Sequence, residues 1–307
     1  MARKKGRKQS LEVPRLAAER ALSDVHRLLE DKEFGSEEEL NEFLSQLTGP
    51  GLGNALAGHE EKDPRRRAQD LAYDAMEAGT SKKVLKLARQ ALELDPDCVD
   101  ARLMVAERTS RNLEEHLALV QQAVEAGERA LGTEFFRENK GHFWRILETR
   151  PYMRARHQLA QMLWSSGRLA EAAAHLAALI ELNPNDNQGV RDELLCLYLF
   201  VRDLELAANL LKAYRGDCSA VFLWGRVLWA FLSGRDKTAQ LDLKEARKGN
   251  PFVENFLTGD KPLPRRLPEM YSFGDESEAI HCAFLQMPAW LVHSEAIAWL
   301  KSMPGQR

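Results

Sequence analysis

The chain has 307 residues, which is long enough for about two domains and a sizeable hydrophobic core. Charged residues make up 29% of it and aromatic residues 7%, a balance that favours helices over a sheet-rich sandwich. The formal net charge of -3 argues against a protein that binds nucleic acid over its whole surface. The four cysteines form no CxxC pair, so we expect buried thiols in a reducing compartment, without disulfides or zinc.

The sequence lacks the patterns of a membrane or secreted protein. Its longest apolar run, residues 220–232, is interrupted by Arg226 and is too short to span a bilayer. Residues 1–9 are basic, but charged residues follow where a signal peptide has its apolar core. We therefore expect a cytoplasmic protein that does not bind membranes. We interpret residues 1–9 as a disordered, solubilising tail, and a nucleic-acid-binding arm remains the alternative.

Residues 10–48 predict a pair of N-terminal helices. A single helical stripe of apolar residues marks the first one, between Leu16 and Leu29. The second starts at Ser36, whose hydroxyl can form a capping box with Glu39. Residues 49–64 are rich in glycine and charge, which indicates a linker.

Residues 65–253 show an internal repeat. Three glycine–proline pairs have the same separation in sequence: Gly79 and Pro96, Gly167 and Pro184, Gly234 and Pro251. An alanine that is followed one helical turn later by leucine recurs at nearly equal intervals, at Ala172, Ala207 and Ala239. Helix pairs that repeat about every 34 residues form solenoids. The predicted fold is all-α: a right-handed α-solenoid of five tetratricopeptide-like helix pairs with turns at the three glycines.

The spacing also predicts one insertion. The equivalents of Ala172 in the first two units are Val84 and Ala118, which lie one repeat length apart, whereas Ala118 and Ala172 lie much further apart than that. The excess falls on residues 133–152, the most aromatic and least periodic part of the repeat region. After the repeats, residues 254–307 predict further helices that cap the last unit.

The chain resembles a family of bacterial tetratricopeptide-repeat proteins, and more remotely the suppressor-of-tumorigenicity-seven family. The resemblance covers residues 68–300 and rests mainly on the strings GHFWRILETRPYMRAR and LNPNDNQGVR. Two departures are Arg145, where glycine is expected, and Asp192, where tyrosine is expected. The resemblance implies a repeat fold and an interaction role, with no defined catalytic residues.

The resemblance further implies which residues line the concave face of the solenoid. In tetratricopeptide repeats these are the second, fifth, ninth and twelfth residues of each unit, on its first helix. Together with the insertion, this gives a surface that is basic in the middle and aromatic at one end. The candidate binding residues are Tyr73, Trp144, Arg150, Tyr152, Arg154, His157, Gln161, Arg191 and Trp224.

Such a surface suits a peptide or partner protein with acidic side chains or a free C-terminal carboxylate. We find no catalytic, cofactor or metal site, because the histidines are scattered and His59 lacks a second histidine at zinc-ligand spacing. Arg150 and Arg154 have a structural alternative, in which they pair with Glu138 or Glu148 and anchor the insertion. The other open functions are nucleic-acid binding through the tail and the arginines and, more weakly, a small-molecule site or enzyme at the insertion.

Overall fold

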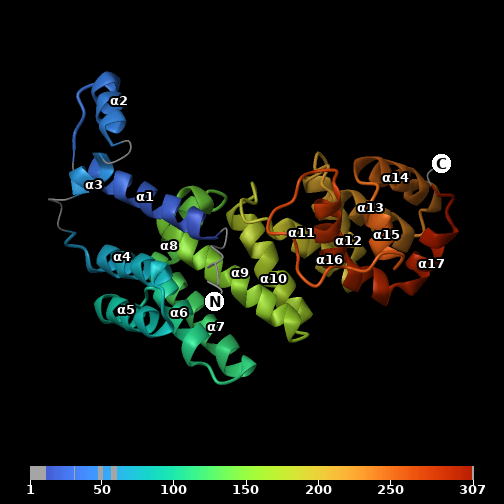
Figure 1. Cartoon of the computed structure of the whole chain (residues 1–307), viewed down its shortest axis with the longest axis horizontal. Coiled ribbons are helices and arrows are strands. Elements are labelled where there is room, and N and C mark those ends of the chain that lie inside the picture. The colour runs from blue at the N-terminus through green and yellow to red at the C-terminus, as the bar shows by residue number, and fades with distance from the viewer. Residues whose placement is uncertain (1–11, 31, 48–50, 57–60, 306–307) are drawn as a thin grey trace, which may run out of the picture. The chain divides into compact units, whose positions relative to one another are not determined.

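A computed structural model describes residues 12–30, 32–47, 51–56 and 61–305. These residues form helices without a strand (Figure 1). The predicted tail at residues 1–9 lies outside them. The helices are α1 Glu12–Glu30, α2 Glu37–Gln46, α3 Gly51–Leu56, α4 Pro64–Glu77, α5 Ser81–Leu94, α6 Val99–Thr109, α7 Leu113–Leu131, α8 Thr133–Asn139, η1 Phe143–Arg145, η2 Leu147–Thr149, α9 Arg150–Ser165, α10 Leu169–Leu182, α11 Val190–Phe200, α12 Leu204–Ala213, α13 Ala220–Leu232, α14 Asp236–Gly249, α15 Val253–Leu257, α16 Glu276–Val292 and α17 Ser294–Ser302.

The helices pack mainly with their neighbours in sequence. In the predicted repeat region they follow one another as α4/α5, α6/α7, α9/α10, α11/α12 and α13/α14, and Figure 1 shows α4 to α7 as adjacent helices. First helices of successive pairs also touch, α4 with α6 and α11 with α13. This arrangement is consistent with a helical repeat. The chain forms two compact units, residues 1–159 (unit 1) and 160–307 (unit 2), which we describe separately.

The second helix of each pair buries residues at a fixed distance from its N-cap. In α5, which is capped by Thr80, the fourth and eighth residues after the cap are Val84 and Ala88, both buried. In α10 and α14 the same positions are Ala172 and Leu176, and Ala239 and Leu243, all buried. The alanines lie where neighbouring helices approach closely, as small residues allow.

The predicted equivalence of Ala118 is wrong, because Ala118 is exposed. The cap of α7 is Asn112, and the eighth residue after it is the buried Val120. The interval from the Thr80 cap to the Asn112 cap is slightly shorter than the repeat length that we assumed. The shift moves the alanine off the buried face.

Glycine closes the turns as predicted. Gly167 and Gly234 have φ angles of 80° and 68°, which other residues rarely adopt, and each follows the first helix of its pair. At the first of these turns the Arg168 amide donates to the Leu163 carbonyl at 2.8 Å, closing the end of α9. Gly79 lies in the α4–α5 turn.

The irregular segments have helical structure of their own. The predicted insertion, residues 133–152, contains α8, η1, η2 and the first residues of α9. Its aromatic residues pack together: the Phe136 ring lies 4.9 Å from Phe143 and 5.2 Å from Tyr152. The segment expected to be a linker contains the short helix α3.

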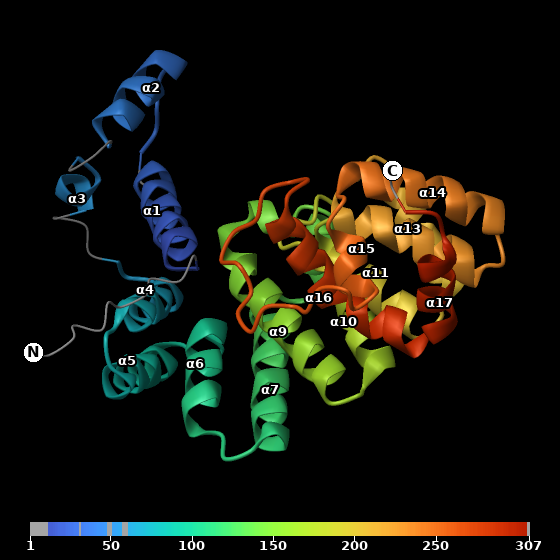
Figure 2. The same ribbon diagram turned by 45° about the vertical axis from the view of Figure 1, so that its right-hand side comes forward.

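The C-terminal helices do not simply close the end of the last pair. Helix α16 packs on the first helices α11 and α13, and on α15 (Figure 2). Its Glu278 carboxylate is buried and accepts hydrogen bonds from the amides of Ala220 (2.8 Å) and Gly274 (2.7 Å). The Gln286 side chain donates to the Val221 carbonyl at 2.5 Å. In unit 2, α16 therefore covers the side of α11 and α13 that we expected to form the open face.

Among the described residues, no helix is both long and apolar enough to span a bilayer.

Candidate functional site

Polar side chains from three consecutive first helices meet in unit 1. The Asp100 carboxylate of α6 accepts hydrogen bonds from Gln69 of α4 (2.8 Å) and from Arg154 of α9 (2.7 and 3.2 Å). Asp100 lies one repeat length after Arg66, the second position of the first unit, so the repeat places it on the same face. Gln69 and Arg154 are at two of the predicted concave positions.

A fourth helix adds the carboxylate on which this cluster converges. Glu19 of α1 is 4% exposed, and the Arg154 guanidinium donates to both of its oxygens at 3.0 and 2.9 Å. The Tyr73 hydroxyl donates to the same carboxylate at 3.2 Å, and the Arg150 guanidinium lies 3.6 Å from it. We call Tyr73, Arg150 and Arg154 the carboxylate site.

Electrostatics keep the carboxylate site in one protonation state. Burial lowers the pKa of Arg154, but Asp100 and Glu19 outweigh burial and raise the pKa above its ordinary value. Burial, together with the Glu19 charge, raises the pKa of Tyr73 above its ordinary value. The site therefore offers a permanent cation and a neutral hydroxyl donor to one carboxylate, an arrangement suited to charge-assisted hydrogen bonds.

Arg150 joins the carboxylate site to the insertion. Its Nε donates to the Trp144 carbonyl at 3.1 Å, and its guanidinium lies 5.1 Å from the centre of the Trp144 ring. These partners differ from Glu138 and Glu148, which we considered as anchors. Arg150 thus holds the insertion through a backbone carbonyl and an aromatic ring, while its charge faces Glu19.

Further ion pairs connect α1 with α4. Arg27 makes two hydrogen bonds to the Asp70 carboxylate, at 3.1 and 3.0 Å, and Arg20 lies 2.9 Å from Asp74. At the end of α1, Glu30 lies 2.5 Å from Arg66. The face of α4 that receives α1 is therefore mainly acidic at Asp70 and Asp74, whereas the carboxylate site on α9 is basic.

Tyr152 has its partners outside this cluster. Tyr152 is buried against α7, where its hydroxyl donates to Glu128, and it accepts a hydrogen bond from Arg156 of α9. Burial raises the pKa of Tyr152 to about 12. His157 is half-buried on α9. In unit 2, Gln161 donates to Glu193 at 2.9 Å.

The last two predicted residues, Arg191 and Trp224, have structural roles in unit 2. Arg191 donates to Asp217 at 2.8 Å, and its guanidinium lies 5.1 Å from the Tyr214 ring. Trp224 is fully buried, with its ring centre 6.3 Å from that of Trp290 on α16. The expected aromatic end of the face is therefore part of the core beneath α16.

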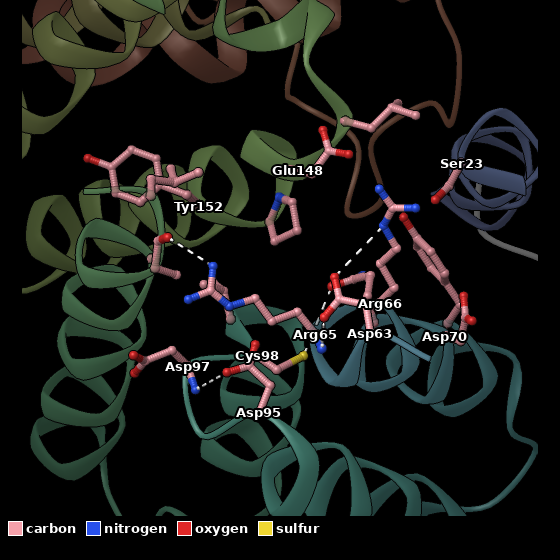
Figure 3. A pocket seen from close by; sticks show the side chains of 18 of the residues that line it. Ser23, Asp63, Arg65, Arg66, Asp70, Asp95, Asp97, Cys98, Glu148 and Tyr152 are labelled. Atoms are coloured by element: carbon pink, nitrogen blue, oxygen red, sulfur yellow. Dashed lines mark hydrogen bonds and ion pairs between the residues drawn. The ribbon is translucent and has the colours of Figure 1, made fainter. Parts of the chain in front are cut away.

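A cavity of about 300 Å³ lies beside the carboxylate site in unit 1. Figure 3 shows its labelled side chains, which include Ser23 of α1, Arg65 of α4, Asp95 of the α5–α6 turn and Glu148 of the insertion. Tyr73 also lines it, and an apolar wall comes from α6, α7 and the insertion. Charged side chains of both signs surround this wall, so the residues that line the cavity do not favour one class of small ligand.

Among the described residues, no group of three or more histidine, cysteine, aspartate or glutamate side chains could hold a metal ion.

Sequence reasoning missed the two carboxylates that organise the cluster. Asp100 could have been found by counting one repeat length on from Arg66, as the repeat allows. Glu19 carries no such signal, because a single glutamate within an amphipathic helix is usually solvent-exposed.

In comparisons with known proteins, no family model, no curated protein and no solved structure matches the chain. The structure establishes that the described residues are helical and that their helices pack mainly with their neighbours in sequence.

Proposed function

We propose that this chain is a non-enzymatic binding protein of the tetratricopeptide-repeat type. Its carboxylate site would receive an acidic side chain, or a C-terminal carboxylate, of a peptide or partner protein. The observation that carries the proposal is the convergence of Tyr73, Arg150 and Arg154 on the single carboxylate of Glu19.

The geometry favours a carboxylate ligand for a physical reason. Glu19 belongs to a helix 135 residues away in sequence from Arg154, so the site already binds a carboxylate that a separate segment brings to it. Each charge-assisted hydrogen bond of this kind contributes on the order of 1.5–3 kcal/mol. Arg154 also keeps a fixed partner, Asp100, which holds its guanidinium in place for the incoming group.

Nucleic acid is less well supported as a ligand. The basic groups of the carboxylate site form no extended basic surface, because α4 presents Asp70 and Asp74 beside them, and a polyanionic backbone would meet like charges there. A single carboxylate needs only the position that Glu19 occupies. No observation in the described part of unit 1 favours an enzyme either, so we propose no second function.

The proposal can be tested by selection from a library of short helical peptides displayed against the full chain. The control is the double variant Arg154→Gln with Asp100→Asn, which removes the cation together with its buried partner and leaves no lone charge between them. We expect the wild-type chain to enrich peptides with Asp or Glu at one fixed position. The double variant should lose this preference at an unchanged helix content, although it should melt earlier because the buried Glu19 loses its main cation. Equal enrichment by both chains would contradict the proposal.

A further inference from the structure

Helix α1 is held on unit 1 mainly by charges. Its acidic and basic side chains pair with groups on α4 and α9. In addition, the Arg27 guanidinium lies 3.1 Å from the carboxylate of Glu61, in the segment before α4. Of its described apolar side chains, only Leu28 is buried, at 7% exposure, while Leu22 is 52% exposed. A ligand that brings the same charges can replace these pairs one for one, so that no buried charge is left without a partner.

The chain offers its own comparison in α16, the long helix that follows the repeats in unit 2. That helix buries an apolar face made of Ala279, Cys282, Ala283, Ala289 and Trp290. A helix that buries this much apolar surface is part of the core of its unit. Helix α1 has a weaker apolar face, with Leu28 buried and Leu16, Val25 and Leu29 half-buried, and unit 1 has a core to which α1 does not belong. That core is formed by α4, α5 and α6 around Ala68, Ala72, Val84, Ala88 and Met104.

The connection between α1 and α4 allows α1 to leave. It spans residues 31–63, and its helix α2 has no buried residue. In both views α2 stands apart from α4 to α7 of unit 1 (Figures 1 and 2). A connection of this length lets α1 move off the surface without displacing α4. It also keeps the released helix near the site, since the cost of loop closure grows only slowly with length.

The contacts of α1 also define the ligand that fits in its place. A carboxylate, Glu19, faces the basic carboxylate site, and an arginine eight residues later, Arg27, faces Asp70 on α4. Eight residues of helix span about 12 Å. The surface therefore favours a helix with a carboxylate followed about two turns later by an arginine, and it disfavours the reverse order, which would place like charges together.

We infer that α1 is an exchangeable internal ligand, and that a partner protein displaces it with a helix of the same charge order. This inference rests on the proposed function, because it assigns the partner class of the same carboxylate site.

The test uses the full chain and one defined probe, a fluorescein-labelled synthetic peptide with the sequence of residues 12–30. The peptide is titrated with the wild-type chain and with Glu19→Gln, which weakens the internal α1 and leaves the carboxylate site intact. We expect Glu19→Gln to bind the peptide at least about tenfold more tightly than the wild type, since the internal competitor has lost its charge-assisted bonds. Arg27→Gln, which releases the other end of α1, should act in the same direction.

Two controls isolate the effect. Glu42→Gln removes the same charge from the exposed surface of α2, and it should leave peptide affinity at the wild-type value. A probe peptide that itself carries Glu19→Gln should lose the gain in affinity.

The outcomes separate the inference from the proposed function. If both chains bind the peptide equally, and binding is lost in Arg154→Gln with Asp100→Asn, the carboxylate site binds acidic helices but α1 is not its internal ligand. Peptide binding by none of the chains would overturn both. A wild-type dimer that dissociates in Glu19→Gln would overturn the choice of partner, because α1 of a second copy would then be the ligand.

Discussion

Asp100 and Arg154 lie 54 residues apart in sequence and are joined by two hydrogen bonds, of 2.7 and 3.2 Å, between α6 and α9. The Asp100 carboxylate is almost fully buried, so hydrogen bonds from protein groups such as Arg154 replace its contacts with water. The pair thus serves the packing of unit 1 and, at the same time, orients the guanidinium toward Glu19. Arg154 is accordingly both a structural and a candidate binding residue, and the two roles need separate experiments.

The structural role predicts a large loss of stability on truncation. We expect Arg154→Ala to lower the free energy of unfolding by about 3–5 kcal/mol, because it leaves the buried Asp100 without a cation and Glu19 with Arg150 alone. Arg150→Ala should cost much less, since its main contacts are the Trp144 carbonyl and ring. Urea denaturation of the two variants measures this difference. Equal and small losses would show that Asp100 is not held by Arg154.

The buried glutamate of α16 predicts a second stability effect, in unit 2. Glu278→Ala removes the acceptor for the Ala220 and Gly274 amides and for Asn250, whose side chain donates to it at 3.0 Å. Leaving such donors unpaired should cost roughly 2–4 kcal/mol in thermal or urea unfolding. The matched control is Glu276→Ala, two residues earlier, where an exposed ion pair with Lys261 is lost and less than about 1 kcal/mol is expected. Similar losses in both variants would contradict the role of Glu278.

The buried carboxyl of Asp192 predicts a pH dependence of stability. Burial, helped by the charges of Asp217 and Asp186 and opposed by Arg191, raises its pKa from 3.8 to about 7. Between these two values the folded chain holds a proton that the unfolded chain has released, so the contribution of Asp192 to stability falls as the pH rises. The slope approaches roughly 1.4 kcal/mol per pH unit within this window.

Asp192→Asn should remove this contribution. Measured by urea unfolding, the variant should gain stability relative to the wild type between pH 5 and pH 7.5, and the difference should grow with pH. A difference that does not change with pH would mean that Asp192 is ionised in the folded state throughout.

Close packing of α7 against the insertion predicts the effect of one added methyl group. A Cβ at Gly127 would lie 2.8 Å from Tyr152 Cδ2 and 3.1 Å from Val99 Cγ2. Gly127→Ala should therefore destabilise unit 1 by about 1–3 kcal/mol through overpacking. At Gly53 of α3 an added Cβ meets nothing within 4 Å, so Gly53→Ala should be neutral or slightly stabilising in the same melting assay. A neutral Gly127→Ala would place Tyr152 elsewhere.

The sequence predicted the helical class and the turns because both depend on local signals. Apolar periodicity marks the helices, and the turns at Gly167 and Gly234 need the positive φ angle that glycine adopts readily. The predicted register of α7 is wrong, because it assumes a constant repeat length, whereas the Asn112 cap with Glu115 three residues later marks a shorter interval from Thr80.

The long-range contacts could not be predicted in this way. The pairing of Glu19 with Arg154 spans 135 residues, and nothing near either residue specifies the other. The same holds for Trp224, which the repeat pattern assigns to an open face. It is buried because α16, a helix outside the repeats, packs on that side.

The carboxylate site binds the side chain of Glu19, and a double-mutant cycle in the full chain tests this contact most directly. The free energy of unfolding is measured for the wild type, Glu19→Gln, Arg154→Gln and the double variant. We predict a coupling energy of about 1–3 kcal/mol between the two side chains, as expected for a charged pair in direct contact. A coupling energy of zero, within about 0.3 kcal/mol, would contradict the account, because Glu19 would then not be bound by Arg154.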